Sequence, residues 1–304
     1  SANVVSMGFQ AFAECSELSG ISLPDGLKTI GYHAFGGCNS LTEVYIPDSV
    51  TSIGRSVFSL CKNLESVHLP KNLKTIGEWM FDSCEKLKTI NIPDSVTNIE
   101  SHAFWLCKSL ESVVIPSGVT TIGGGAFKDC TALTDIDIPD SVTSIEVYAF
   151  SNCSKLENIE LPEKITSIDN GTFNGCSALN NIIIPDAVTS IGDYAFSGCT
   201  SFTGVIVPDS VISIGEYAFS DCSNLKNIRL SENLTSLSRE IFHACHSLTD
   251  VVIPDGITFI GRYAFFECKS ITDIKIPKNV QEIDFGAFYS TGFDSAVIPK
   301  NVKT

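Results

Sequence analysis

The chain repeats one segment of 23 residues along almost its entire length. The stretch Leu179 to Ser201 reads LNNIIIPDAVTSIGDYAFSGCTS, and every proline and cysteine follows its register, apart from a one-residue shift at Pro299. The cysteines run from Cys15 to Cys268 in steps of 23. A fixed period of this length is typical of solenoids, in which each unit buries its apolar face against its neighbours. We predict a single solenoid domain over residues 1–304 with about thirteen repeats.

Each repeat predicts a short strand, a turn, a return segment and a short helical piece. Ile182 and Ile184 alternate with Ile183, so the first two should point inward and Ile183 outward. The spacing of Phe196 and Cys199 suits a helical or 3₁₀ turn. We therefore predict a right-handed α/β-type solenoid. One parallel sheet forms one face, and short helical, 3₁₀ or irregular segments form the other.

The phenylalanine and cysteine registers are predicted to be internal columns. Phenylalanine fills its register from Phe12 to Phe288. Cysteines in register point the same way from coils about 4.8 Å apart, whereas a disulfide needs Cβ atoms near about 3.8 Å. We expect buried, unreactive thiols and no disulfides. His243 and His246 flank Cys245 but occupy variable surface positions, so we expect no metal site there.

Charge and residue patterns exclude several functional classes. The formal net charge of −15 argues against binding to nucleic acids or anionic membranes. No apolar run reaches the length of about 18 residues that spans a bilayer, so we expect no membrane insertion in this segment. No acid, base and nucleophile are grouped around any histidine, so we expect neither an enzyme nor a cofactor.

The N-terminal residues lie in the middle of a repeat. Val4, Met7 and Phe12 share the register of Leu27, Ile30 and Phe35. Terminal repeats of solenoids normally carry distinct polar caps. We therefore expect the chain to be part of a longer protein, and no signal peptide is recognisable at its start.

The outward position of the predicted strands is the most variable column. Because solenoids use their concave sheet face for binding, exposed apolar residues in this column are candidate contacts. An alternative is that β-branched residues there simply favour strands. The candidate binding surface consists of Tyr45, His68, Val114, Ile183, Ile206, Arg229 and Val252.

Two further columns carry polar or aromatic residues. An acidic residue usually follows the proline, as at Asp186 and Asp209, where we favour a role in the turn over cation binding. On the side opposite the predicted sheet, several aromatic residues share one register or lie close to that register. They form either a surface on which glycan rings stack or a layer that packs over the return segment. They are Trp79, Trp105, Tyr148, Tyr194, Tyr217, Tyr263 and Phe266.

The pattern Leu-x-x-Ile-x-Ile-Pro followed by Val-x-x-Ile-Gly-x-x-Ala-Phe-x-x-Cys resembles the BspA-type leucine-rich repeat. Rungs such as VPDSVISIGEYAFSDCSNL, from Val207 to Leu225, carry this resemblance over nearly the whole chain. The resemblance implies a microbial cell-surface or secreted protein, often an adhesin that binds host or neighbouring-cell proteins. The alternatives are a carbohydrate-binding or cell-wall-binding module and an interaction domain of a larger multidomain protein.

Two departures from the pattern are visible. Mixed small or polar residues such as Ser49 and Gly118 replace the buried asparagine column of ordinary leucine-rich repeats, so no continuous asparagine ladder is expected. In the rung after Leu230, Ser231 replaces proline, Leu237 replaces isoleucine and Ser238 replaces glycine. This rung is the place where we expect a local bend or weakened pairing.

Overall fold

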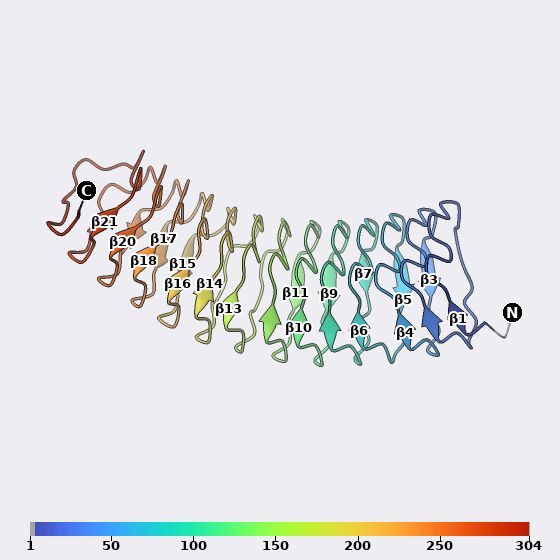
Figure 1. Cartoon of the computed structure of the whole chain (residues 1–304). Coiled ribbons are helices and arrows are strands. Elements are labelled where there is room, and N and C mark those ends of the chain that lie inside the picture. Colours follow the sequence, from blue (N-terminus) through green and yellow to red (C-terminus); the bar gives the residue numbers. More distant parts are fainter. Residues whose placement is uncertain (1–3, 304) are drawn as a thin grey trace. The chain divides into compact units, whose positions relative to one another are not determined.

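The computed structural model of the protein describes residues 4–303 (Figure 1). The chain forms two compact units that meet in the sequence between Leu156 and Glu157, here called unit 1 and unit 2. In each unit the backbone winds into stacked coils, and residues 23 positions apart are paired in parallel. Most coils contribute to two rows of strands. We call the strands of the Ile-x-Ile-Pro segments the front row and those before the glycine register the return row.

Unit 1 has both rows. Its front row pairs as β3-β5 and β7-β9-β11, and its return row as β1-β2-β4 and β6-β8-β10-β12. The front-row bounds are β3 (Glu43–Tyr45), β5 (Ser66–His68), β7 (Thr89–Ile90), β9 (Ser112–Val114) and β11 (Asp135–Asp137). The return-row bounds are β1 (Ser6–Met7), β2 (Thr29–Ile30), β4 (Ser52–Ile53), β6 (Thr75–Ile76), β8 (Asn98–Ile99), β10 (Thr121–Ile122) and β12 (Ser144–Ile145).

Unit 2 repeats the arrangement. Its front row is β15-β17-β19, and its return row pairs as β13-β14-β16 and β18-β20-β21. The front-row bounds are β15 (Gly204–Ile206), β17 (Asn227–Arg229) and β19 (Asp250–Val251). The return-row bounds are β13 (Ser167–Ile168), β14 (Ser190–Ile191), β16 (Ser213–Ile214), β18 (Ser236–Leu237), β20 (Phe259–Ile260) and β21 (Glu282–Ile283). The prediction of parallel strands in a 23-residue register is confirmed.

The segments that carry the phenylalanine and cysteine registers, here called the turn segments, differ from the prediction of helical pieces. Within residues 4–303 they form consecutive turns, and no helix occurs. Tyr194 and Gly198 have φ values of 55° and 74°, and left-handed residues four positions apart interrupt a right-handed helix. Alternate amides donate instead to the following coil, as in Tyr194 N to Glu216 O, Phe196 N to Ala218 O and Gly198 N to Ser220 O. Hydrogen bonds between coils therefore replace those that a helix would make within itself.

The phenylalanines form the centre of the core in each unit. In unit 1 the rings from Phe12 to Phe150 stack with centroids 5.2 to 5.7 Å apart. In unit 2 the rings from Phe173 to Phe288 stack at 5.3 to 6.0 Å. All the rings except those of Phe12 and Phe288 are buried. Burial of one such side chain contributes about 1.5–3 kcal/mol, so these columns are a large part of each core.

The cysteines are free thiols, and all except the exposed Cys15 are buried. The buried thiols donate to a backbone carbonyl of the preceding coil, as Cys61 Sγ does to Phe35 O at 3.1 Å. Burial raises the pKa of Cys38 to about 11 and that of Cys61 to about 12. The prediction that the cysteines form a buried internal column is confirmed for all of them except Cys15.

The column that replaces the asparagine ladder has a structural role. Ser49 Oγ donates to Leu27 O at 2.7 Å, and Ser141 Oγ donates to Val119 O at 2.7 Å. Asn279 Nδ2 donates to Asp255 O of the preceding coil, two residues before the position that the serines bond, at 2.7 Å. Polar residues of different kinds therefore satisfy carbonyl groups of the preceding coil, so this column does not require asparagine.

The divergent rung after Leu230 is regular on one row and interrupted on the other. Strand β17 pairs with both β15 and β19, so the front row is not interrupted at this rung. The return row is divided between β16 and β18, where Ser238 Oγ donates to Ile214 O. The return row is likewise divided between β4 and β6, where the rungs follow the repeat, so this division is not specific to the divergent rung. No helix in the part of the chain that the structure describes is long and apolar enough to cross a membrane.

Candidate binding surface

Two isoleucines project from adjacent coils of unit 2. Ile183 is 75% exposed and Ile206 is 66% exposed, whereas Ile182 and Ile184 on either side of Ile183 are 6% and 5% exposed. The alternation expected from the sequence is thus confirmed, although residues 181–185 are not part of a strand. The side chains that face solvent are as apolar as those that form the core.

These isoleucines border open depressions on the front-row face. A depression of about 430 Å³ is lined by Ile183, Ile206, Asn181 and Asn227. Gly204 lies on its floor, where a Cβ would come within 2.6 Å of Asn227 Oδ1. A neighbouring depression of about 460 Å³ shares Ile183 and extends to Glu160 and Glu163. The surface therefore combines two apolar projections with hollows that are lined by amides and carboxylates.

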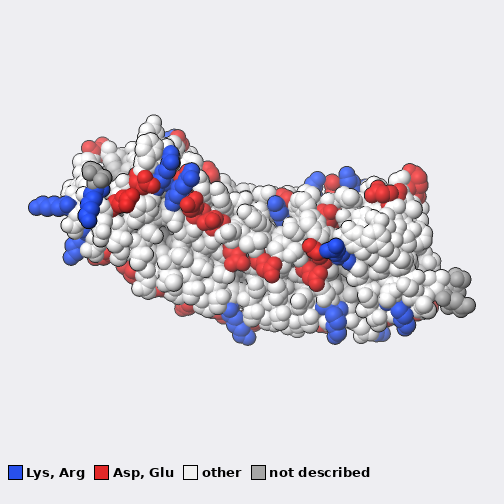
Figure 2. Space-filling model, in the orientation of Figure 1, with Lys and Arg blue, Asp and Glu red and all other residues white. Residues whose placement is uncertain are grey.

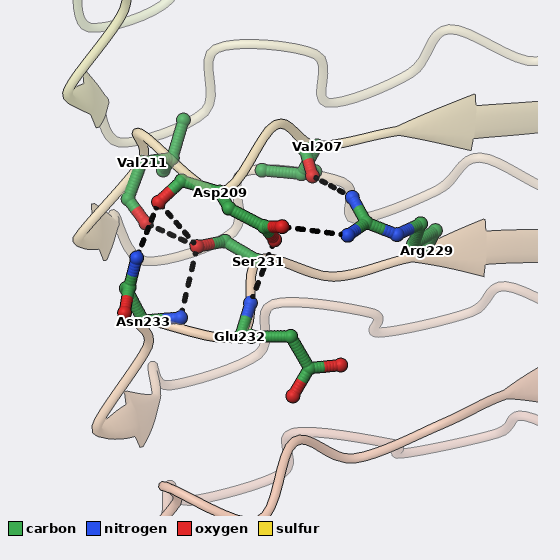
Figure 3. A network of polar contacts seen from close by, with 7 residues as sticks. All are labelled: Val207, Asp209, Val211, Arg229, Ser231, Glu232 and Asn233. Carbon is green, nitrogen blue, oxygen red and sulfur yellow. Dashed lines mark hydrogen bonds and ion pairs between the residues drawn. The ribbon is translucent and has the colours of Figure 1, made fainter.

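Arg229 ends the apolar strip at β17. It is the register partner of Ile206, and its guanidinium lies 2.8 Å from Asp209 Oδ2 and 3.3 Å from Val207 O. Figure 3 shows the Arg229 side chain reaching toward these groups of the preceding coil. The Glu232 amide and the Arg229 guanidinium lower the pKa of the Asp209 carboxyl. The structure therefore brings Ile183 and Ile206 together and separates them from Val252.

Val252 belongs to a third depression of unit 2. It is 70% exposed and borders a volume of about 370 Å³ together with Lys275. The carboxylate-bearing residues of its lining are Glu232, Asp250, Asp255 and Asp273. This part of the face is thus more acidic than the part around Ile206.

The candidate residues of unit 1 form a separate group. The rings of Tyr45 and His68 stack at 4.4 Å with an interplanar angle of 5°. Near them Lys71 Nζ lies 2.8 Å from Asp48 Oδ2, and this hydrogen bond lowers the pKa of Asp48. Val114 is exposed on β9 and pairs in register with Asp137, so it does not join the aromatic pair.

The acidic residues after the proline register bond between coils. Asp48 Oδ1 accepts the amide of Lys71 at 2.9 Å, and Asp209 Oδ1 accepts the amide of Glu232 at 3.0 Å. At these two positions the partner amide therefore belongs to the following coil and not to the local turn. Among the described residues no group of three or more His, Cys, Asp or Glu side chains is arranged to hold a metal ion.

Charges on this molecule are mixed, with carboxylates in excess. Figure 2 shows acidic side chains interspersed with Lys and Arg on the face in view, where the described residues form no continuous basic stripe.

The two histidines on either side of Cys245 make local contacts. His243 Nδ1 lies 3.6 Å from Glu240 Oε2, and His246 Nδ1 lies 3.0 Å from Glu267 O. Both histidines are therefore engaged by groups of their own or the following coil.

The aromatic residues of the turn segments stack along their register. Tyr194 and Tyr217 lie 4.6 Å apart at 5°, and Trp79 and His102 lie 4.2 Å apart at 3°. Partial burial and the hydrogen bond from Tyr217 Oη to Glu240 raise the pKa of Tyr217 to about 12. Sequence reasoning identified most of these residues, but it did not identify His102 as the partner of Trp79.

Comparisons with known proteins agree with this architecture. The model of the BspA type leucine rich repeat region matches residues 1–111, 97–207 and 189–304. A leucine-rich repeat protein from Bacteroides ovatus ATCC 8483 is 30% identical, with a TM-score of 0.79 over 98% of this chain and 82% of that chain. A leucine rich cell surface protein from Faecalibacterium prausnitzii A2-165 is 31% identical, with a TM-score of 0.60 over 97% of this chain and 89% of that chain. A search of curated proteins found no match.

Proposed function

The chain belongs to the BspA-type leucine-rich repeat family. On that premise we propose that it is a microbial protein-recognition scaffold that is either displayed on the cell surface or secreted. In this proposal it acts as an adhesin toward proteins of a host or of neighbouring cells, and it has no catalytic role. The observation that carries the proposal is the exposure of Ile183 and Ile206 beside shared hollows on the front row of unit 2.

The apolar pair provides an anchor for a protein partner. Complete burial of one such side chain contributes about 1.5–3 kcal/mol, so two adjacent isoleucines form a compact contact of useful strength. Asn181 and Asn227 lie in the same depression and can pair with backbone groups of a partner. An apolar centre with a polar rim is the usual composition of a protein interface.

The surrounding carboxylates indicate the chemistry of the partner. Glu160, Glu163 and Asp186 line the depressions that contain Ile183. Opposite charges across an interface accelerate association and exclude wrong partners. We therefore expect a protein segment that presents an aliphatic or aromatic side chain flanked by Lys or Arg.

A surface location is supported by one relative. The protein from Faecalibacterium prausnitzii is described as a cell surface protein, and its sequence is 31% identical over most of both chains. The same front-row surface would also serve an interaction domain within a larger protein. Fractionation of the source cells, followed by detection with an antibody, tests the location independently of binding.

The binding experiment uses immobilised collagen, laminin and fibronectin with the whole chain in solution. The double variant Ile183→Asp/Ile206→Asp replaces the apolar anchor with charge and should reduce binding at least about tenfold, since the loss of one buried side chain exceeds the 1.4 kcal/mol that corresponds to that factor. Ile212→Asp is the matched control because Ile212 is 63% exposed but lies next to β16 in the return row.

The outcomes separate the parts of the proposal. Binding that persists in the double variant would show that the front row of unit 2 is not the contact. Equal loss in Ile212→Asp would indicate a nonspecific effect of added charge. If none of the three matrix proteins binds the unmodified chain, the adhesin role fails. Binding that weakens with added salt would support a basic partner.

A further inference from the structure

A slot in unit 1 lies among the turn segments, away from the front row. It is an open hollow of about 310 Å³, and its lining consists of Tyr32, His33, Arg55, Ser56, Ser59 and Trp79. His33, Ser56 and Trp79 occupy the same register on three successive coils. Ser56 is thus a small residue at a position where the coils on either side carry a ring, and the slot is the space that its side chain leaves open.

One face of the Trp79 indole lines this slot. The ring of His102, from the following coil, covers the opposite face at 4.2 Å and 3°. Trp105 packs against Trp79 edge to face, with the centroids 5.3 Å apart. The indole Nε1 donates to Glu78 Oε1 at 3.1 Å, which fixes the orientation of the ring. The free face is therefore a rigid aromatic platform that faces a hollow.

Polar groups surround the platform. The Arg55 guanidinium lies 5.3 Å from the centre of the Tyr32 ring and 3.4 Å from Glu78 Oε2, so it forms a charged rim. Ser59 Oγ donates to the buried Asp82 carboxylate at 3.0 Å on the floor. Hydrogen-bond donors and acceptors thus lie within the same small volume as an aromatic face.

A second depression is linked to the slot through Glu78, which lines it and whose carboxylate contacts both Trp79 Nε1 and Arg55. It is an open hollow of about 300 Å³ along the return row of unit 1. Its polar lining consists of Glu78, Asn98, Glu100, Ser101, Thr121 and Glu146. Carboxylates, an amide and hydroxyl groups therefore continue from the aromatic platform along several coils.

We propose that the slot and this second depression bind an oligosaccharide. The C–H face of a pyranose ring would stack on Trp79, as an apolar surface does on an aromatic ring. The sugar hydroxyls would bond to Arg55 and to the carboxylates and hydroxyls of the second depression. Three glutamates exclude anionic sugars, so the ligand is neutral or amine-bearing. The site lies in unit 1 and is independent of the proposed protein contact in unit 2.

Fluorescence of the intact chain tests the proposal. The chain has two tryptophans, so in a Trp105→Phe background Trp79 is the sole tryptophan. Cellohexaose, maltohexaose and chitohexaose are titrated separately at up to millimolar concentration. At least one of them should change the emission of Trp79 in a saturable way, and calorimetry of the unmodified chain should give the same dissociation constant.

Two variants locate the site. Ser56→Tyr fills the slot with a ring and should be tolerated, because Ser56 has a φ of 57° and Tyr217 and Tyr148 hold 57° and 58° in the same register. Trp79→Leu removes the platform. Each should weaken binding about tenfold or more by calorimetry, as expected for the loss of aromatic stacking and its hydroxyl contacts. Tyr194→Leu, at the same register in unit 2, is the control and should bind as the unmodified chain does.

Two results would overturn the proposal. One is the absence of a saturable response to all three oligosaccharides. The other is unchanged affinity in Ser56→Tyr, whose fold is verified by circular dichroism even if Trp79→Leu is unstable. Neither result bears on matrix-protein binding through Ile183 and Ile206.

Discussion

Ser231 Oγ donates to the backbone carbonyl of Val211 at 2.5 Å, from a position that is proline in most other rungs. The same oxygen accepts the amide of Asn233 at 3.2 Å, and the residue is completely buried. Figure 3 shows this hydroxyl among polar groups of two adjacent coils. A proline here would lack the hydroxyl, so the departure from the repeat is accompanied by its own set of bonds.

Replacing this serine should therefore destabilise unit 2. Ser231→Ala leaves the buried Val211 carbonyl and the part-buried Asn233 amide without this partner, and we expect the free energy of unfolding to fall by about 1–3 kcal/mol. Urea denaturation followed by circular dichroism measures the change. Ser210→Ala is the control because Ser210 Oγ, within the described structure, is buried without a hydrogen-bond partner. The explanation is wrong if both variants lose the same stability.

The thiols should react according to their burial. The thiolate is the reactive form, and burial raises the pKa of Cys38 to about 11 and that of Cys61 to about 12. In the folded protein we expect iodoacetamide at mildly alkaline pH to modify the exposed Cys15 and to leave the buried thiols unmodified. Mass spectrometry should show one adduct in buffer and twelve after denaturation. Rapid labelling of several cysteines in buffer would contradict the stacked-coil packing.

The internal columns could be predicted because a fixed period brings like residues together. Phe196 and Cys199 recur at each step of 23, and stacking the repeats places each beside its equivalent. The prediction of short helical pieces was wrong. Apolar residues spaced one and three positions apart fit a helical turn, but they also fit successive turns. The deciding feature is the left-handed backbone at Tyr194, which is uncommon for a residue with a side chain.

The surface contacts were harder to predict from the sequence. The exposure of Ile183 and Ile206 follows from strand alternation, but the pairing of Arg229 with Asp209 depends on the path of a long flexible side chain. The slot at Ser56 depends on what is missing between His33 and Trp79. Comparing side-chain sizes down that register would have indicated it, since Ser56 stands between two rings, although Gly125 and Gly171 are small residues of the same register.

Neighbouring isoleucines of one coil should respond oppositely to truncation. Ile182→Ala removes a buried side chain and should cost about 2–5 kcal/mol, because a cavity remains in the core. Ile183→Ala changes a side chain that faces solvent and should alter stability by no more than about 0.5 kcal/mol. Thermal denaturation of both variants provides the comparison. A large loss in Ile183→Ala would place that residue in an intramolecular contact and remove it from the candidate surface.

Acid sensitivity should depend on Asp209. The Glu232 amide and the Arg229 guanidinium lower its pKa in the folded protein below the ordinary 3.8. A carboxyl with a depressed folded pKa contributes stability above its unfolded pKa, and this contribution is lost as the pH falls through the folded value. Asp209→Asn should therefore be less stable than the unmodified chain at neutral pH, and the difference should shrink below about pH 4.

The control for this prediction is Asp186→Asn. In the coil after Asp186, the residue that corresponds to Arg229 is Ile206, which forms no ion pair. Denaturation midpoints measured from neutral to acidic pH test this, and parallel profiles for the unmodified chain and Asp209→Asn would show that the Asp209 contacts do not contribute.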